Sequence, residues 1–576
     1  MTTIAFLVVV YDFGFYTSPS WNRFTESFYP FIFLLFFLTY FFRILFFRQL
    51  RTNNWRRYFD YFIGIILFLT SDLGIFDPVY LIEKFPWLRF FETALFYHTL
   101  IIFIFSLEIS KGTLNLYKIR FNPSLLYAGS FFFLILLGAG LLMLPRSSTV
   151  ETDLVDAVFT ATSAVCVTGL IVVDTATHFT PLGQSVILLL FQLGGLGVMI
   201  FTSFFGFFFM GAPSFQNQIF LKDFVNEARM GKIFRTLYKI LGFAFLVEIT
   251  GAAIVYIFQS QPHLGLQTNV WNAVFHSVSA FCNAGFSVFT DGMNDIQNGT
   301  YQNFHLHLVI AIMVVLGGIG FPVILNYFTW MKNRFNDNFR KLLRKRSAHR
   351  FPHLINVNTR IVSITTIILI VGGTISFWWF ERNNLLNGMS FYGAFVTSFF
   401  GAVTPRTAGF NTIDTSAMVV PTVLITIFLM WVGASPSSCG GGIKTSTLAL
   451  AVSNIVSMAR GKTRIELFGR HIADENIRRA FAIIILSVLI IGLGVFLLSI
   501  TDGDLGMKNI VFECFSAFST VGLSLGITAE LSDSGKIIIS CLMFIGRIGT
   551  LTIVVAFFRK LRSYQYQYPK ETIYIN

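Results

Sequence analysis

TSAVCVTGLIVVDTATHFTPLGQSVILLLFQLGGLG is the sequence from Thr162 to Gly197. Its first apolar segment is too short to cross a bilayer, which needs about 20 residues, and it leads into Val167, Thr168 and Gly169. A longer apolar segment opens after Pro181. The pattern predicts a re-entrant half-helix, a loop and a spanning helix. Irregular backbone is tolerated at membrane depth only inside protein or along a water-filled path, so we expect the loop carbonyls to face such a path.

The composition indicates the class of the whole chain. Its 576 residues are 54% hydrophobic and only 12% charged, which is typical of a polytopic membrane protein. The net charge of +13 lies in a few short loops between apolar runs, so it indicates membrane orientation and not a nucleic-acid partner. The five cysteines include no CxxC pair, so we expect buried packing and neither a disulfide frame nor a zinc site.

The first 120 residues contain three apolar segments long enough to span, at 29–47, 58–78 and 92–109. Arginine and lysine follow the first and the third, so both of those loops are expected on the cytoplasmic side. The opening residues have no basic region or cleavage site of a secretory signal. Residues 1–28 either start outside or contain a short membrane element within Ile4–Tyr16, and the sequence leaves both possibilities open.

From Phe121 onward the chain repeats itself. Four loops read SAVCVTGL, SAFCNAGF, AVTPRTAGF and SAFSTVGL, and their glycines recur at intervals of roughly 115–125 residues. Three of the loops have a serine six residues before the glycine, whereas the third has Val403 there. Since one loop supplies a quarter of a carbonyl ring, four loops predict a complete ring.

A second signature recurs in step with the loops. Small-residue clusters follow at 193–197, 316–320, 432–436 and 545–549, and we expect each at the middle of a second spanning helix. Glycines in membrane helices also simply permit close packing. Four clusters in register behind four loop glycines favour the repeat.

These repeats predict an all-α polytopic membrane protein with four parallel helix, pore-loop and helix units around one pore. The expected organisation is extra N-terminal membrane helices over 1–120, units over 121–215, 216–335, 336–460 and 461–560, and a cytoplasmic tail over 561–576. Basic linkers at 222–235, 332–350 and 460–470 are expected inside. Acidic residues gather on the other side, where they would concentrate cations: Glu151, Asp153, Asp156, Asp174, Asp291, Asp295, Asp414, Asp502, Asp504, Glu530 and Asp533.

The loops carry the predicted chemistry, because backbone carbonyls can replace the hydration shell of a large monovalent cation such as potassium. Each loop must turn its carbonyls inward, and glycine permits the positive φ that this requires. The predicted ion selectivity filter comprises Val167, Thr168, Gly169, Asn283, Ala284, Gly285, Thr407, Ala408, Gly409, Thr520, Val521 and Gly522.

Residues 121–560 resemble the Trk/Ktr/HKT superfamily of potassium transporters, nearest the bacterial TrkH and KtrB subunits. The resemblance rests on the four loops and on TPRTAGFNTID at 404–414, GGGIKTS at 440–446 and GRIG at 546–549. It implies potassium uptake across the bacterial cytoplasmic membrane, no cofactor in this chain, a homodimer and a cytosolic nucleotide-binding regulatory subunit of the RCK type. Sodium-selective plant members have serine where this chain has Gly169. Sodium or sodium-coupled transport, and the pore-like subunit of an ATP-driven potassium pump, stay open as alternatives.

The third unit has a helix-breaking run just inside its loop. The resemblance implies an intramembrane gate there, and a static bulge is the alternative. The expected gate residues are Gly433, Ser435, Pro436, Ser437, Gly440, Gly441, Gly442, Lys444 and Arg547. Arg547 lies at a depth where charge is costly, and it could shape the conduction barrier, bind the loop carbonyls, or both.

Three more charged residues lie in apolar surroundings. We expect Arg406 to point behind the filter, and Glu248 and Glu513 are candidate partners for the buried arginines.

Other protein classes fit the chain poorly. An enzyme is not expected, because the chain has no HExxH motif and its 433–437 run lacks the closing glycine of GxSxG. Ile443 separates Gly442 from Lys444, so the run is not a Walker A motif and no nucleotide site follows from it. Alternating-access transporters usually show inverted repeats, whereas these four are parallel.

Overall fold

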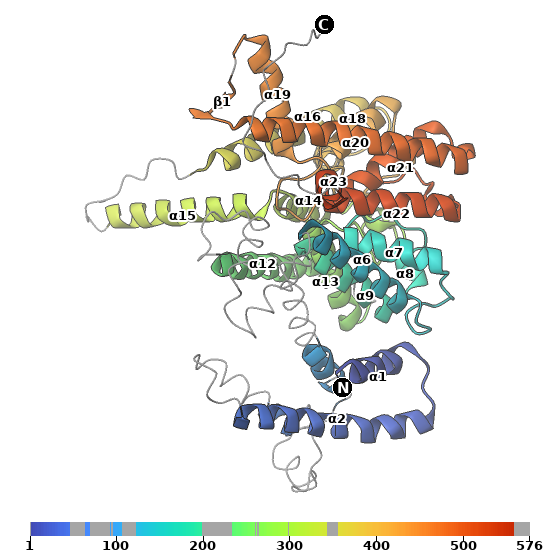
Figure 1. The fold of residues 1–576 in the computed structure, drawn as a ribbon. Helices are drawn as coiled ribbons and strands as arrows, with labels where there is room; N and C mark the ends of the chain where they lie inside the picture. The colour runs from blue at the N-terminus through green and yellow to red at the C-terminus, as the bar shows by residue number, and fades with distance from the viewer. Residues whose placement is uncertain are drawn as a thin grey trace.

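The computed structural model describes residues 2–46, 64–68, 93, 96–105, 123–197, 233–259, 261, 264–297, 299–342, 355–462 and 464–557. These residues are mainly helical, and within them the one sheet is a two-stranded hairpin of β1 (Glu466–Leu467) and β2 (Arg470–His471). In Figure 1 the helices run mostly side by side, with α15 (Phe321–Leu342) and β1 at one end and α8 (Thr175–His178) at the other.

Residues 123–557 contain four successive groups of one first helix, one short helix and one second helix. The first group is α6 (Pro123–Leu142), α7 (Leu154–Cys166) and α9 (Pro181–Leu196), and the second is α12 (Ile233–Gln259), α13 (Leu266–Cys282) and α14 (Phe304–Gly318). The third is α16 (Val357–Glu381), α17 (Phe391–Val403) and α18 (Val420–Trp431), continued by α19 (Thr445–Ala459). The fourth is α20 (Asp474–Thr501), α21 (Met507–Ser519) and α22 (Asp533–Ile548), continued by α23 (Thr550–Phe557).

The first helices of groups two to four are the membrane-spanning candidates. Among the described residues, Thr236–Gln259, Val357–Glu381 and Asp474–Thr501 are each long and apolar enough to cross a bilayer. Each also exposes large apolar side chains, for example Ile249, Ile368 and Leu489, all more than 60% exposed. Such apolar faces suit contact with lipid, because the hydrocarbon core of a bilayer offers no hydrogen-bond partners to polar groups.

The short helices are buried instead. α7, α17 and α21 have 13 residues each, which at 1.5 Å per residue is roughly two thirds of a bilayer core. In α7 every residue from Phe159 to Cys166 is buried, because α6, α9 and α22 pack around it. This agrees with the half-helix that the sequence predicts at Thr162–Cys166.

The four groups contact one another in a single cycle. Each second helix packs against the short helix of the next group, in the pairs α9 with α13, α14 with α17, α18 with α21, and α22 with α7. An ion pair of 2.5 Å between Lys536 on α22 and Asp156 on α7 bridges the last pair. The last group therefore packs back onto the first.

The second helices differ from expectation at their small-residue clusters. α9 ends at Leu196, α14 ends at Gly318 and meets α15 at a bend of 98°, and α22 ends at Ile548. Gly197, Gly320 and Gly549 have φ values of 89°, 92° and 92°, which are not helical. The expectation of continuous second helices with clusters at their middles is therefore wrong, because a break occurs in every group and not in the third alone.

The glycines of these clusters also permit close packing between helices, which is the alternative interpretation of why they are there. A Cβ added to Gly194, Gly317 or Gly546 would collide with a carbonyl oxygen at the end of the short helix of the same group, on Val165, Phe281 and Phe518 respectively. Both interpretations of the glycines thus apply to the same clusters.

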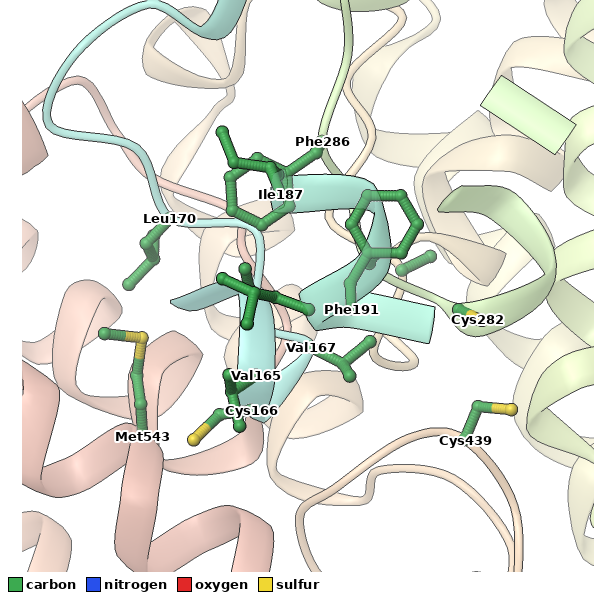
Figure 2. Close-up of a cluster of buried hydrophobic side chains, with 14 of the residues drawn as sticks. Val165, Cys166, Val167, Leu170, Ile187, Phe191, Cys282, Phe286, Cys439 and Met543 are labelled. Atoms are coloured by element: carbon green, nitrogen blue, oxygen red, sulfur yellow. The ribbon is translucent and has the colours of Figure 1, made fainter. Parts of the chain in front are cut away.

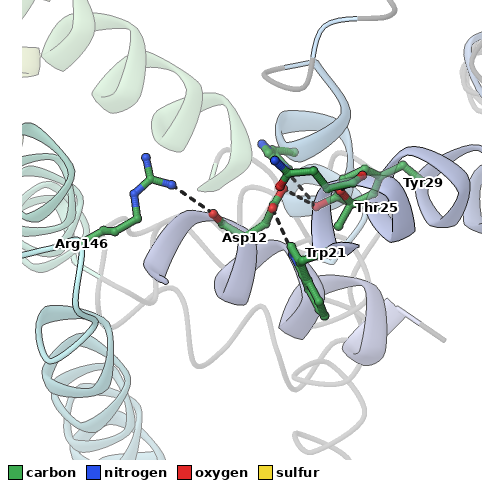
Figure 3. Close-up of polar contacts among 7 residues, drawn as sticks. Asp12, Trp21, Thr25, Tyr29 and Arg146 are labelled. Carbon is green, nitrogen blue, oxygen red and sulfur yellow. Dashed lines mark hydrogen bonds and ion pairs between the residues drawn. The ribbon is translucent and has the colours of Figure 1, made fainter. Parts of the chain in front are cut away.

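The N-terminal helices form a separate small core around Ala5, Val9 and Phe33. A helix, α1 (Thr2–Gly14), occupies most of the Ile4–Tyr16 stretch, and α2 (Pro19–Phe46) begins ten residues before the predicted span. Most of the predicted span at 58–78 lies outside the described residues. Asp12 accepts hydrogen bonds from Trp21, Tyr29 and His98 at 3.2, 3.1 and 2.8 Å (Figure 3).

Arg146 ties this small core to the first group. Its guanidinium donates to the carbonyl oxygen of Asp12 at 3.3 Å, and its backbone N–H donates to the carbonyl oxygen of Gly14 at 2.9 Å (Figure 3).

Candidate functional site

Each short helix ends at a residue with left-handed backbone or shortly before one. Val167, Asn283, Thr407 and Thr520 have φ values of 59°, 60°, 70° and 50°. For a β-branched residue this conformation is a genuine outlier, and three of the four are β-branched. Such strain persists only where the surroundings over-determine it, and it clusters at functional sites.

Two residues further on, each loop has its predicted glycine with positive φ. The φ values of Gly169, Gly285, Gly409 and Gly522 are 89°, 72°, 75° and 94°. The positive φ predicted at these glycines is therefore present in all four loops.

The four glycines also lie against one another's loops. A Cβ on each would collide with a backbone carbonyl oxygen of the next loop, in the pairs Gly169 with Ala284, Gly285 with Ala408, Gly409 with Val521, and Gly522 with Thr168. The contacts pass once round all four loops and return to the first, so a side chain at any of these positions would open the cycle.

The carbonyl oxygens in these contacts have no donor. Thr168, Ala284, Ala408 and Val521 are fully buried. Among the hydrogen bonds of the described residues, none is accepted by their carbonyl oxygens. Buried backbone carbonyls are nearly always paired with protein or water, so four of them in one cycle need a partner from outside the chain.

Hydroxyl groups hold the loops from behind. The hydroxyls of Ser163 and Ser516 accept the backbone N–H of their own loop glycines, each at 3.1 Å, and Ser279 donates to the carbonyl oxygen of Phe286 at 2.8 Å. In the third loop Thr404 donates to the carbonyl oxygen of Phe410 at 2.6 Å. The sequence shows that the three serines recur, but it does not indicate what they do. It gives no signal for Thr404, because that residue stands five and not six residues before its loop glycine.

Apolar side chains pack around the first loop and the second (Figure 2). Val165, Val167 and Leu170 belong to one buried cluster with Phe191 of α9 and Phe286 of the second loop. The rings of Phe191 and Phe286 stack with centroids 6.1 Å apart. This packing joins the first two loops at their backs.

An open cavity of about 620 Å³ lies at the end of the loops that contains their glycines. All four loop glycines line it, and so do Asp174, Asp291 and Asp414. Two of these carboxylates also hold the local backbone, since Asp174 accepts the N–H of Ala176 and Asp414 that of Ser416. The cavity thus holds three carboxylates next to the four loop glycines.

The predicted gate segment lies against the opposite ends of the same loops, at Thr407 and Thr520. A Cβ on Gly440 would collide with the hydroxyl of Thr407, and one on Gly441 with the hydroxyl of Thr520. The segment is anchored to the end of α14, where Ser435 and Cys439 donate their backbone N–H groups to the carbonyl oxygens of Gly318 at 3.0 Å and Gly317 at 3.3 Å. The carbonyl oxygen of Ser437 accepts from the backbone N–H of Phe321 at 3.1 Å, next to Pro436.

Two basic residues bind the carbonyls of this segment. Lys444 donates to the carbonyl oxygen of Gly440 at 2.7 Å, and Gly442 has positive φ beside it. Arg547 donates to the carbonyl oxygens of Cys439 and of Gly194. Arg547 therefore bridges the gate segment and the end of α9, as one of its two predicted roles requires.

The remaining charged residues lie away from the loops' inner face. Arg406 is 7% exposed and lines a small cavity with Val315 of α14 and Thr366 of α16. The expected pairing of the glutamates with buried arginines is wrong for the described residues. Glu248 instead accepts both of its hydrogen bonds from Gln192, at 2.9 and 3.1 Å, and Glu513 accepts from Thr528.

Helices long and apolar enough to cross a bilayer, a cycle of carbonyls without a donor among the described residues and an acidic cavity beside them indicate a class: this is a membrane transport protein. The family model for TrkH, described as a cation transport protein, matches residues 99–567. Because the match spans more than half of the chain, the chain belongs to the TrkH family of cation transport proteins.

Comparisons with individual proteins also find potassium uptake and transport proteins. The chain is 37% identical to the potassium/sodium uptake protein NtpJ of Enterococcus hirae over 465 residues, which cover 79% of this chain and 97% of that protein. It is 36% identical to the Ktr system potassium uptake protein B of Bacillus subtilis, with 79% and 97% covered. The crystal structure of the potassium transporter TrkH from Vibrio parahaemolyticus has a similar fold, with a TM-score of 0.59 at 15% identity over 76% of this chain and 84% of that one.

Proposed function

We propose that this chain mediates potassium uptake through a pore whose selectivity filter is the cycle of four loops. The observation that carries the proposal is the set of four buried, unpaired carbonyl oxygens in that cycle. Carbonyl dipoles without fixed charge suit a large monovalent cation, which sheds its water more readily than a small one. The names of the B-type Ktr relatives, which are potassium uptake proteins, support the same cation.

In this proposal the four groups are parallel repeats around one pore per chain, with the boundaries that the sequence predicts. The filter consists of the loop residues from the left-handed position to the glycine in each group. The acidic cavity is the outer entrance, and the bacterial cytoplasmic membrane is the expected location. Support comes from the single cycle of contacts between second and short helices.

Sodium is the second candidate cation. The relative from Enterococcus hirae is named as a potassium/sodium uptake protein. The four loops also differ at the position two residues before the glycine, which is occupied by Val167, Asn283, Thr407 and Thr520. The proposed filter is therefore less uniform than one made of four identical loops. Competition between the two cations decides between them.

We predict that Gly169→Ser lowers the preference for potassium over sodium by on the order of tenfold, since strained backbone costs about 1–3 kcal/mol. Serine at this position would adopt a φ of 89° and place its Cβ 2.5 Å from the carbonyl oxygen of Ala284. The measurement is rubidium-86 uptake into proteoliposomes with competing potassium and sodium.

Gly388→Ser is the matched control, because Gly388 also has positive φ, at 80°, but nothing lies within 4 Å of its Cβ position. It should leave selectivity unchanged. Equal competition by potassium and sodium in the unaltered protein would contradict the proposed selectivity.

The segment from Gly433 to Gly442 is, in this proposal, a movable barrier beneath the filter. It lies directly against Thr407 and Thr520, and its anchors are a few backbone hydrogen bonds together with Lys444 and Arg547. Glycines at both of its ends lower the barrier to a backbone rearrangement. A cation leaving the filter would meet this segment and the positive charge of Arg547.

We predict that deleting Pro436–Cys439 raises rubidium flux severalfold. The deletion removes the part of the barrier that includes Cys439, whose carbonyl oxygen accepts a hydrogen bond from Arg547. Arg547→Gln, which keeps the length of the segment, should raise flux less. The measurement is initial uptake in proteoliposomes at equal protein density. A folded deletion variant with unchanged flux and unchanged regulation would leave the segment as a static bulge.

The chain is further proposed to act as a homodimer under a cytosolic RCK-type nucleotide-binding subunit. The support is the basic inner surface at 460–470, where the β1–β2 hairpin carries Arg470 and Arg464 stands close by. Contact with anionic lipid headgroups is the alternative use of such charge.

We predict that the chain captures a soluble nucleotide-binding protein from native membranes and that ATP changes its flux. The measurement is a pull-down followed by mass spectrometry, with rubidium flux compared in native vesicles with and without ATP. A variant with Arg464→Glu and Arg470→Glu should recover less of the partner. Recovery of no soluble partner, together with no nucleotide effect, would contradict the regulated assembly and leave the pore proposal standing.

A further inference from the structure

The acidic entrance has a carboxylate from three of the four groups. Asp174, Asp291 and Asp414 stand five or six residues after their loop glycines, and all three line the outer cavity. The fourth group has Ile527 and Thr528 at the corresponding places. Its part of the entrance therefore has no carboxylate of its own.

Thr528 does, however, connect the entrance to a carboxylate behind it. Thr528 lines the cavity, and its hydroxyl donates to Oε1 of Glu513 at 2.5 Å. Glu513 lies on α21, the short helix that leads into the fourth loop, and it is 0% exposed. The fourth group thus holds its acid one layer deeper than the others do.

Glu513 lacks a counter-charge within the described residues. The side chains of Thr528 and Ser524 are the polar neighbours of its carboxylate. Its second oxygen, Oε2, is buried and makes no hydrogen bond of good geometry there, and no ion pair among the described residues includes it. The two other buried glutamates differ, because both of their carboxylate oxygens accept hydrogen bonds. Those of Glu248 accept from the amide of Gln192, and those of Glu381 accept from Asn384 and from the backbone N–H of Val419. A buried carboxylate is costly unless it is paired with an opposite charge, and the hydroxyls of Thr528 and Ser524 offset only part of that cost.

We propose that Glu513 is the fourth acid of the entrance, a positioning residue that favours a monovalent cation at the outer end of the filter beside Gly522. This inference rests on the proposed cation pathway and adds to it a named source of charge. The cation at the entrance is the counter-charge that the protein does not supply, and Thr528 is the polar contact between them.

Burial gives this acid a property that the other three do not share. Exposed charges are screened by salt over about 8–10 Å at physiological ionic strength, whereas buried charges are screened much less. The carboxylates of Asp174 and Asp414 face the open cavity. The effect of Glu513 on the cation should therefore persist at high ionic strength, when that of the aspartates fades.

The test is rubidium-86 uptake by the purified full-length chain in proteoliposomes, measured against external rubidium concentration. Glu513→Gln keeps an acceptor for Thr528 and removes the charge. We expect its half-saturating rubidium concentration to rise about fivefold, which corresponds to a loss of roughly 1 kcal/mol of attraction for the cation. The rise should persist in added choline chloride, and Glu513→Asp should stay near the unaltered protein. An unchanged half-saturating concentration in Glu513→Gln overturns the inference.

A second set of variants distinguishes an electrostatic role of Glu513 from a role in holding the fourth loop in place. The double variant Glu513→Gln with Thr528→Asp places the carboxylate where the other groups have theirs, so half-saturation should return toward the original value. Thr528→Val removes the brace and keeps the charge, and it should change half-saturation less than Glu513→Gln does. If Glu513 only braces the loop, the double variant stays defective and Thr528→Val is as defective as Glu513→Gln, which overturns the inference.

If Glu513→Gln does not fold, as size-exclusion chromatography would show, the double variant decides alone by the same criterion. A fivefold rise in its half-saturating concentration then overturns the inference, and a value near that of the unaltered protein supports it. Failure of the unaltered protein to take up rubidium would overturn the proposed function itself.

Discussion

The contact between each loop glycine and the carbonyl oxygen of the next loop is the constraint on which the rest of the structure depends. A methyl group at Gly169 or Gly522 would collide with that oxygen, so the loops can close a cycle only without side chains there. Four chain segments must then end at one level, which the short helices achieve by stopping after 13 or 17 residues. The second helices approach closely enough to hold them because Gly194, Gly317 and Gly546 allow backbone contact.

The sequence predicts the parts of this arrangement that repeat. The period of the loops, the four glycines with positive φ and the buried short helices follow from composition and spacing alone. The left-handed backbone at Val167, Thr407 and Thr520 could not be predicted, because β-branched side chains disfavour it locally and only the completed cycle imposes it. Thr404 escapes prediction for a related reason: the third short helix ends differently, so its hydroxyl reaches the loop from another position.

Contacts between segments that are distant in the sequence are the other feature that could not be predicted. Buried arginines and glutamates suggest ion pairs, yet Glu248 is bound by an amide, and Arg547 binds backbone carbonyls of the gate segment and α9. Partners of this kind depend on how the helices break, and those breaks come from Gly197, Gly320 and Gly549. At the end of α14 the Gly433–Gly442 segment binds the backbone directly, through the carbonyl oxygens of Gly317 and Gly318. The cycle of loops and the Gly433–Gly442 segment thus both lie against the glycine clusters of the second helices.

The central claim is that the unpaired carbonyls of the four loops bind the transported cation. Thallium is a heavy substitute for potassium, so its anomalous signal in a crystal of the purified chain tests the claim directly. The account predicts a thallium peak enclosed by the carbonyl oxygens of Thr168, Ala284, Ala408 and Val521, which potassium displaces more readily than sodium does. Thallium bound elsewhere in the chain, with no peak inside the cycle of loops, would contradict it.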